Sequence, residues 1–114
     1  MLDYRTISTE RQFKDSTGHS KKTFAILLLD FEKTYMQEYG TNYETYIVEN
    51  VTEEVKLKTL GDILFLVLFQ LKNGLIWGSL GVIFNMSEST AHRNFKKYSK
   101  LLERTLEKKG NAKT

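Results

Sequence analysis

The last fifth of the sequence concentrates positive charge. From His92 to Thr114 there are eight lysines or arginines and two glutamates, which give a net charge of +6. The preceding 91 residues hold nine basic and twelve acidic side chains and carry −3, so the whole chain is only +3. Positive side chains gathered in one segment are typical of a surface that binds a polyanion. The chemistry predicted for this segment is therefore phosphate binding.

The spacing of these residues predicts a long helix from Ser87 to about Lys109, closed by Gly110. Its basic stripe is Arg93, Lys97, Lys100, Arg104 and Lys108, and its apolar stripe is Ala91, Phe95, Tyr98, Leu102 and Leu106. Arg93 and Phe95 differ by two positions, or about 200° of helix rotation, so the stripes lie nearly opposite. We expect the apolar stripe to pack on a helix at residues 59–73, which leaves the basic stripe free for phosphates.

A helix-turn-helix is predicted at about residues 75–98. A short helix covers about 75–84, the chain breaks at 85–86, and the long helix follows. Asn85 takes the turn position usually held by glycine, because asparagine visits the left-handed backbone region at modest cost. Around this turn the buried, corner-filling and small residues of the motif are Leu80, Gly81, Phe84, Met86 and Ala91.

The first turns of the second helix are where recognition helices present side chains to base edges. Ser87 is placed to cap this helix, and Arg93 can make a bidentate bond to guanine. Ser89, Thr90 and His92 can bond to several bases. Lysines and arginines supply position and affinity through phosphates. The predicted DNA-binding residues are Ser87, Ser89, Thr90, His92, Arg93, Lys96, Lys97, Lys100 and Arg104.

The basic stripe, Glu88 and Trp77 each have an interpretation that does not involve DNA. The basic stripe is also what the solvated face of an amphipathic helix looks like. Glu88 in the first turn complements the helix dipole without touching a base. We interpret Trp77 as partly buried core and leave it outside the binding site.

The upstream elements predict an all-α fold, a compact helical domain of about five helices spanning residues 1–114. Proline is absent, and helices are expected at 9–17, 20–39 and 59–73, each followed by glycine. Thr59 and Asp62 match a capping box at the start of the third. Residues 41–58 lack a clear period and are interpreted as an ordered loop with room for a short helix, and 111–114 as a flexible tail.

Several functions are excluded by residue types. The chain has no cysteine, and its two histidines, His19 and His92, lie 73 positions apart, so we expect no metal and no cofactor. The adjacent pair Glu53-Glu54 lacks the setting that tunes acid-base catalysis. The longest apolar run, residues 63–69, falls far short of the roughly 20 residues that cross a bilayer. The expectation is a cytoplasmic protein without membrane contact.

A family resemblance rests on an N-terminal set of residues together with the tandem that starts at Leu75. The set is Arg11-Gln12-Phe13, Thr17-Gly18, Phe24, Leu27-Leu28 and Phe31. Over about residues 11–109 the sequence resembles the N-terminal region of DDE-type insertion-sequence transposases. The resemblance implies a module that binds the terminal inverted repeats of the element in double-stranded DNA. It also implies a separate catalytic transposase subunit, or a second copy in a homodimer, as a partner.

The sequence departs from this family in three ways. Asn85 replaces the usual turn glycine, and the segment 41–58 is acidic where relatives often carry a basic, glycine-rich linker. The RNase H-like catalytic domain of the family has no counterpart in the sequence, so we expect no enzymatic activity. A protein-protein assembly module and a free-standing transcriptional repressor remain as alternatives. Charge segregation favours DNA over assembly, because assembly surfaces are depleted of lysine.

Overall fold

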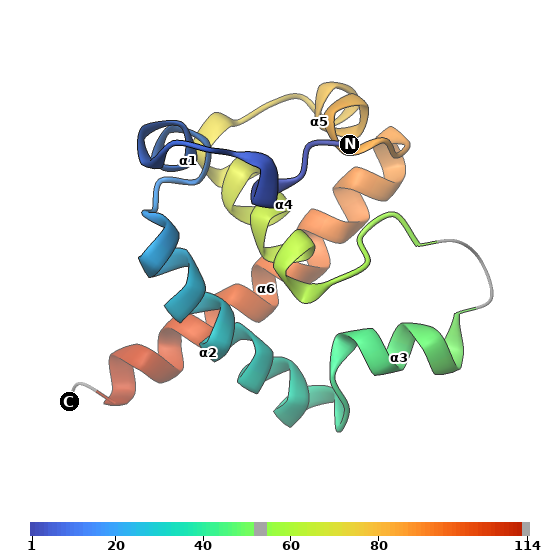
Figure 1. Ribbon diagram of the computed structural model, residues 1–114. Coiled ribbons are helices and arrows are strands. Elements are labelled where there is room, and N and C mark those ends of the chain that lie inside the picture. The colour runs from blue at the N-terminus through green and yellow to red at the C-terminus, as the bar shows by residue number, and fades with distance from the viewer. Residues whose placement is uncertain (52–54, 113–114) are drawn as a thin grey trace.

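The computed structural model describes residues 1–51 and 55–112, and every regular element within these ranges is helical (Figure 1). A short 3-10 turn, η1 (Tyr4–Thr6), comes first. The helices are α1 (Glu10–Thr17), α2 (Lys21–Tyr39), α3 (Tyr43–Asn50), α4 (Leu60–Asn73), α5 (Trp77–Phe84) and α6 (Glu88–Ala112). The predicted all-α fold is confirmed, and α3 is the short helix for which the predicted loop left room.

The helix boundaries follow from local hydrogen bonds. Thr9, Ser20 and Asn42 each accept a bond from the backbone N–H three residues ahead, so each caps its helix. Thr59 and Asp62 form the predicted capping box, in which each side chain accepts the other residue's backbone N–H. Glycines in the left-handed conformation follow α1, α2 and α4. The predicted ends of these three helices are confirmed.

Helix α4 is the centre of the core. Every residue from Leu60 to Leu68 is buried, and α1, α2 and α6 pack around it. A helix that is apolar on all sides has to be covered on all sides, which explains why three helices surround it. No helix in the described ranges is long and apolar enough to cross a membrane.

Helix α6 packs on both α4 and α2, and this changes its buried face. Leu106, predicted to be buried, is 50% exposed, whereas Leu101 and Thr105 are buried. The Thr105 hydroxyl donates to the Thr34 hydroxyl of α2 at 3.0 Å. Because α2 lies beside the C-terminal half of α6 (Figure 1), the buried face turns toward α2 in that half.

The end of α6 also differs from the prediction. The helix continues through Gly110 to Ala112, so residues 111–112 of the predicted flexible tail are helical. Residues 113–114 lie outside the described residues. The predicted end at Lys109 was therefore wrong, because nothing forces a helix to end at a glycine that is exposed to solvent.

The N-terminal segment ties α4 to α5. Arg5 donates to Asp62 at 3.0 Å and to Thr59 at 2.9 Å, so it joins the capping box of α4. The Leu2 backbone N–H donates to the Ile83 carbonyl of α5 at 3.0 Å. Residues from outside the tandem therefore help to hold its first helix, α5, against the supporting helix α4.

Candidate nucleic-acid interface

The turn between α5 and α6 has the predicted conformation. Asn85 has φ 55° and ψ 49°, and it is the one non-glycine residue with positive φ in the described part of the chain. Met86 N–H donates to the Gly81 carbonyl at 2.8 Å. A Cβ on Gly81 would overlap the Met86 carbonyl oxygen, so the close approach requires glycine. This contact fixes where α6 leaves the turn.

The first turn of α6 is held by its own hydroxyl groups. Ser87 Oγ accepts the Thr90 backbone N–H at 3.2 Å and donates to Thr90 Oγ1 at 2.8 Å, which confirms Ser87 as the cap. Arg93 Nη2 donates to the same Thr90 hydroxyl at 3.3 Å. Ser87 and Thr90 are therefore partly occupied by local bonds, whereas Ser89 is exposed in this turn.

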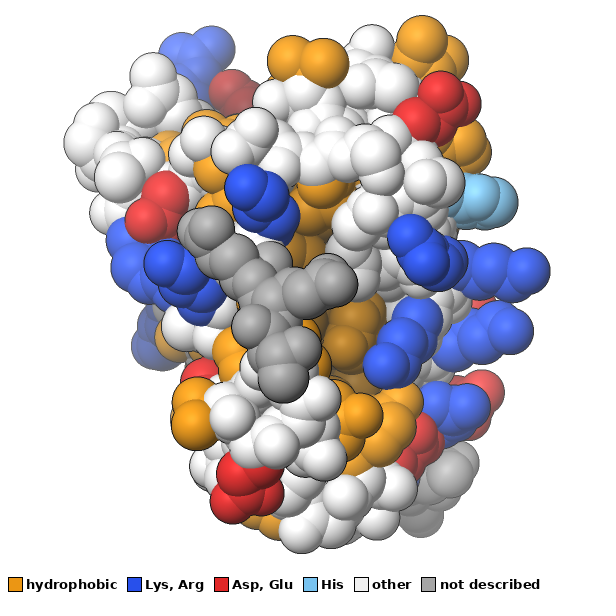
Figure 2. Space-filling model, turned by 90° about the vertical axis from the view of Figure 1, so that its right-hand side faces the viewer, with side chains coloured by type: hydrophobic (Ala, Val, Ile, Leu, Met, Phe, Trp, Pro, Cys, Tyr) orange, Lys and Arg blue, Asp and Glu red, His pale blue; other side chains and the backbone are white. Residues whose placement is uncertain are grey.

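One face of α6 is basic and exposed. Ser89, Arg93, Lys96 and Lys100 follow one another at intervals of four, three and four residues, which places them on one side of the helix. All four are exposed, and the opposite side carries the buried Ala91 and Leu102, among others. Figure 2 shows lysine and arginine side chains gathered along one edge of the molecule. We call Ser89, Arg93, Lys96 and Lys100 the exposed basic face.

His92 lies beside this face and is in contact with α5. Its ring stacks on Trp77, with ring centroids 4.6 Å apart and planes 30° apart. Trp77 also contacts Phe95 at 5.4 Å and is half-buried, as predicted for a core residue. Glu88 lies in the first turn of α6, where a carboxylate complements the positive end of the helix dipole.

The C-terminal half of the basic stripe is engaged by α2. Arg104 Nη1 lies 3.0 Å from Glu38 Oε2, and Lys108 donates to the Gln37 amide oxygen. Lys109 forms a third contact, to Asp30 at 3.0 Å. The expectation that the whole stripe stays free was therefore wrong at Arg104 and Lys108. The pattern could not reveal these contacts, because the α2 residues lie 66 or more positions away in sequence.

Lys97 occupies an intermediate position. Its Nζ lies 5.5 Å from the centroid of the Tyr39 ring and 5.1 Å from that of Tyr98, so two aromatic faces contact the ammonium group. The side chain remains exposed. Cation-π contacts of this kind restrict a flexible lysine, and they leave its charge in place.

A cluster of tyrosines beside Lys97 pins the segment between α3 and α4. The Tyr43 hydroxyl donates to the Leu57 carbonyl at 2.6 Å, and the Tyr43 ring meets that of Tyr98 edge-on at 6.4 Å. Burial raises the pKa of both hydroxyls well above the usual tyrosine value. The segment around Leu57 is therefore anchored beside α6.

The described residues give no support for a metal site. Residues 1–51 and 55–112 contain no group of three or more histidine, cysteine or acidic side chains that could hold a metal ion. The pair Glu53-Glu54 lies outside the described residues.

Comparison with known families identifies one segment of the chain. Residues 55–108 match the family described as helix-turn-helix of DDE superfamily endonuclease. The match starts before α4 and extends through α5 into α6, so it covers the tandem and the helix that supports it. The N-terminal half of the resemblance, residues 11–31, lies outside the matched segment. Comparisons with curated proteins and with solved structures give no significant match.

Proposed function

We propose that this chain binds double-stranded DNA sequence-specifically as the DNA-binding part of a transposase, because residues 55–108 match the family described as helix-turn-helix of DDE superfamily endonuclease. Its proposed target is the terminal inverted repeats of an insertion sequence. The observation that carries the proposal is the exposed basic face of α6, which directly follows a well-formed helix-turn-helix corner.

The dimensions of this face fit a major groove. Ser89 and Lys100 are eleven residues apart, which is about 16 Å along a helix, and the major groove is about 12 Å wide. The first turns of α6 therefore enter the groove, whereas Lys100 reaches the phosphates at its edge. Lys96 and Lys97 add phosphate contacts, and such contacts supply most of the affinity.

Arg93 is the proposed main base reader. One nitrogen of its guanidinium already contacts Thr90, which restricts the side chain, and its remaining N–H groups can bond a guanine edge. Ser89 is exposed one turn earlier and contacts a neighbouring base. His92, stacked on Trp77, contacts the base or backbone at the α5 side of the groove.

The division of labour within the proposed transposase follows from the residue types. Residues 1–51 and 55–112 hold no acidic cluster that could bind a metal ion, and in the proposed arrangement a separate catalytic subunit or domain performs the cleavage. Binding two inverted repeats also gives a role to a second copy of the chain. The proposed place of action is DNA in the cytoplasm.

The test is a selection of binding sites from randomised duplexes with the full chain. A salt titration by fluorescence anisotropy then compares the selected duplex with a shuffled duplex of equal length. We expect salt-sensitive binding that prefers the selected duplex, and a selected sequence that matches insertion-sequence ends. Equal binding to both duplexes would contradict sequence-specific reading. An absence of binding at low salt would contradict DNA binding altogether and favour an assembly module.

A further inference from the structure

We propose that a second DNA contact lies beside α6, in the hollow between this helix and residues 55–57. Its occupant is one sugar-phosphate strand of the duplex whose major groove α6 enters. The inference deepens the proposed function and rests on it. It adds Lys56 and Asn94 to the interface, and neither belongs to the exposed basic face.

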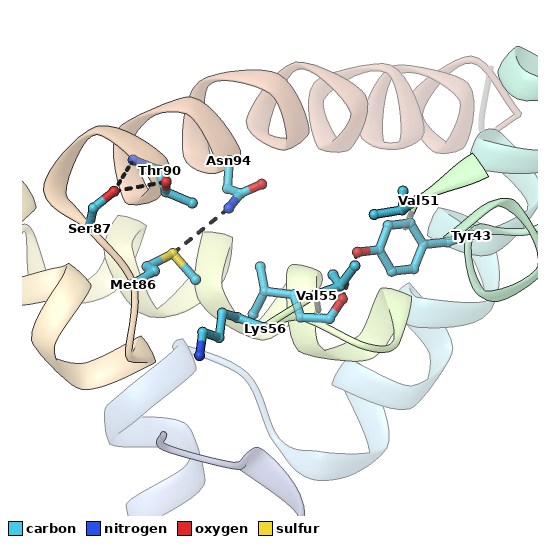
Figure 3. Close-up of a pocket in the computed structure, with 9 residues that line it drawn as sticks. Tyr43, Val51, Val55, Lys56, Met86, Ser87, Thr90 and Asn94 are labelled. Atoms are coloured by element: carbon cyan, nitrogen blue, oxygen red, sulfur yellow. Dashed lines mark hydrogen bonds between the residues drawn. The ribbon is translucent and has the colours of Figure 1, made fainter. Parts of the chain in front are cut away.

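The hollow has a volume of about 410 Å³ and a mixed lining. Helix α6 contributes the polar side chains of Thr90 and Asn94, and Ser87 lies beside Thr90 at the start of the helix (Figure 3). The rest of the lining is largely apolar, with Met86 and Val55 among its residues. This combination suits a sugar-phosphate strand, which presents C–H groups from its sugars together with anionic oxygens.

Lys56 supplies the positive charge. It is exposed, and it lines this hollow as well as a second one of about 560 Å³ beside the turn at Asn85 and Ser87. The neighbouring Leu57 is buried and its carbonyl is bonded by Tyr43, so the backbone that carries Lys56 is held in place.

Asn94 supplies a hydrogen-bonding group with a poor partner. In the described part of the chain its Nδ2 donates to the sulfur of Met86, 3.8 Å away, and a thioether is a weak acceptor (Figure 3). A phosphate oxygen is a much better acceptor for an amide N–H, because it is anionic. Binding of a phosphate here would therefore replace a weak bond by a strong one.

The position of the hollow matches that of a DNA backbone. Thr90 and Ser87 belong both to the hollow and to the first turn of α6, so the hollow opens beside the base-reading residues. A helix in the major groove has one sugar-phosphate strand on each side. The strand on the α3 side then passes Lys56 and Asn94, and Lys96 and Lys100 of the exposed basic face reach the other strand.

The chain offers a matched pair of lysines for the test. Lys56 and Lys58 are both exposed on the same segment, but Lys58 lines neither hollow. We expect Lys56→Gln to weaken binding to selected and shuffled duplexes alike. It should reduce the slope of log K against log salt concentration by about 0.9, the value for one phosphate. Lys58→Gln should match the wild type, and Lys56→Arg should restore the slope.

A modified duplex locates the contact. Single phosphates are replaced by neutral methylphosphonates along each strand of the selected duplex. At one phosphate position, the replacement should weaken DNA binding by the wild type but should not weaken DNA binding by the Lys56→Gln variant any further. Equal slopes for Lys56→Gln and Lys58→Gln would overturn the inference, even if wild-type binding still upheld the proposed function. If the wild type bound no DNA, the proposed function would fail first.

Discussion

Arg93 and Lys96 carry the same charge on the exposed basic face, but they can recognise different things. The arginine guanidinium is a planar fork that matches the two acceptors of a guanine edge, whereas a lysine ammonium is a compact point charge. Arg93 is also restrained by its bond to Thr90 at 3.3 Å. We therefore assign sequence reading to Arg93 and affinity to Lys96.

Replacing Arg93 by lysine separates these roles. Arg93→Lys keeps the charge, so the salt dependence should remain unchanged. It loses the bidentate bond, so preference for the selected duplex over the shuffled one should fall roughly 10- to 100-fold, which corresponds to about 1–3 kcal/mol. The ratio of the two Kd values measures this change. Lys96→Arg is the control and should leave the ratio unaltered. An unchanged ratio in Arg93→Lys would remove Arg93 from base reading.

Single residues could be predicted from sequence where their role is local. The Ser87 cap and the left-handed Asn85 depend on neighbours within a few positions, and both predictions are confirmed. The stacking of His92 on Trp77 and the pairing of Arg104 with Glu38 depend on how distant helices pack. No periodicity in α6 carries that information, so these contacts were missed. Whether the predicted site residues touch DNA stays a prediction.

At the scale of elements, the approach of α5 to α6 depends on Gly81. A Cβ at this position would overlap the Met86 carbonyl oxygen, which belongs to the backbone and cannot rotate away. Gly78 lies in the same helix, but a Cβ there would have Glu88 Oε2, at 4.0 Å, as its nearest neighbour. A side chain is therefore excluded at Gly81 but not at Gly78, although both residues belong to α5.

Alanine substitutions test this difference. Gly81→Ala should reduce the free energy of unfolding by about 1–3 kcal/mol, the usual cost of overpacking. Gly78→Ala should be neutral or stabilising by up to about 1 kcal/mol, because alanine is the better helix former. Urea denaturation followed by circular dichroism measures both values. A Gly81→Ala variant as stable as Gly78→Ala would show that the corner tolerates a side chain.

The contact between α2 and α6 sets how far the basic surface extends. Glu38 pairs with Arg104 at 3.0 Å, and both side chains are partly exposed. Such a pair contributes only about 0–1 kcal/mol to stability. Its main effect is therefore on Arg104, whose charge it offsets close to the proposed DNA-binding surface.

Releasing Arg104 should strengthen DNA binding. Glu38→Gln removes the paired carboxylate, so affinity should rise and the salt slope should steepen by up to about 0.9. Glu49→Gln on α3 changes the net charge equally at an exposed position and serves as control. Salt titrations of both variants decide the matter. Identical effects of Glu38→Gln and Glu49→Gln would show that only the net charge matters. The double variant Glu38→Gln/Arg104→Gln should lose the increase in affinity that Glu38→Gln alone produces.

Helix positions were largely predictable because caps and terminal glycines are local signals. The exception is α3, in a segment whose mixed aromatic and polar residues show no period. Among its residues only Tyr43 is buried, so a continuous apolar stripe was never required. The far end of α6 was also missed, since an exposed glycine interrupts the pattern without ending the helix.

At the scale of the whole molecule, the N-terminal half supports the helix-turn-helix. The matched family segment holds α4, α5 and α6 as far as residue 108, whereas α1 and α2 pack on α4, and α2 also packs on α6. The fold class was predictable from helical periodicity and the absence of proline. The packing of α2 along α6 could not be predicted. Both helices also bury apolar residues against α4, so their apolar residues are explained whether they pack on α4 or on each other.

Binding of DNA phosphates by the exposed basic face of α6 is the step on which the proposed function depends. The most direct measurement is a salt titration of Lys96→Gln/Lys100→Gln beside the wild type on the selected duplex. The control is Lys14→Gln/Lys22→Gln, which removes two exposed lysines from α1 and α2. We expect the α6 variant to lose about 1.8 units of slope, about 0.9 for each phosphate, and the control to keep the wild-type slope. Equal slopes in both double variants would contradict this expectation.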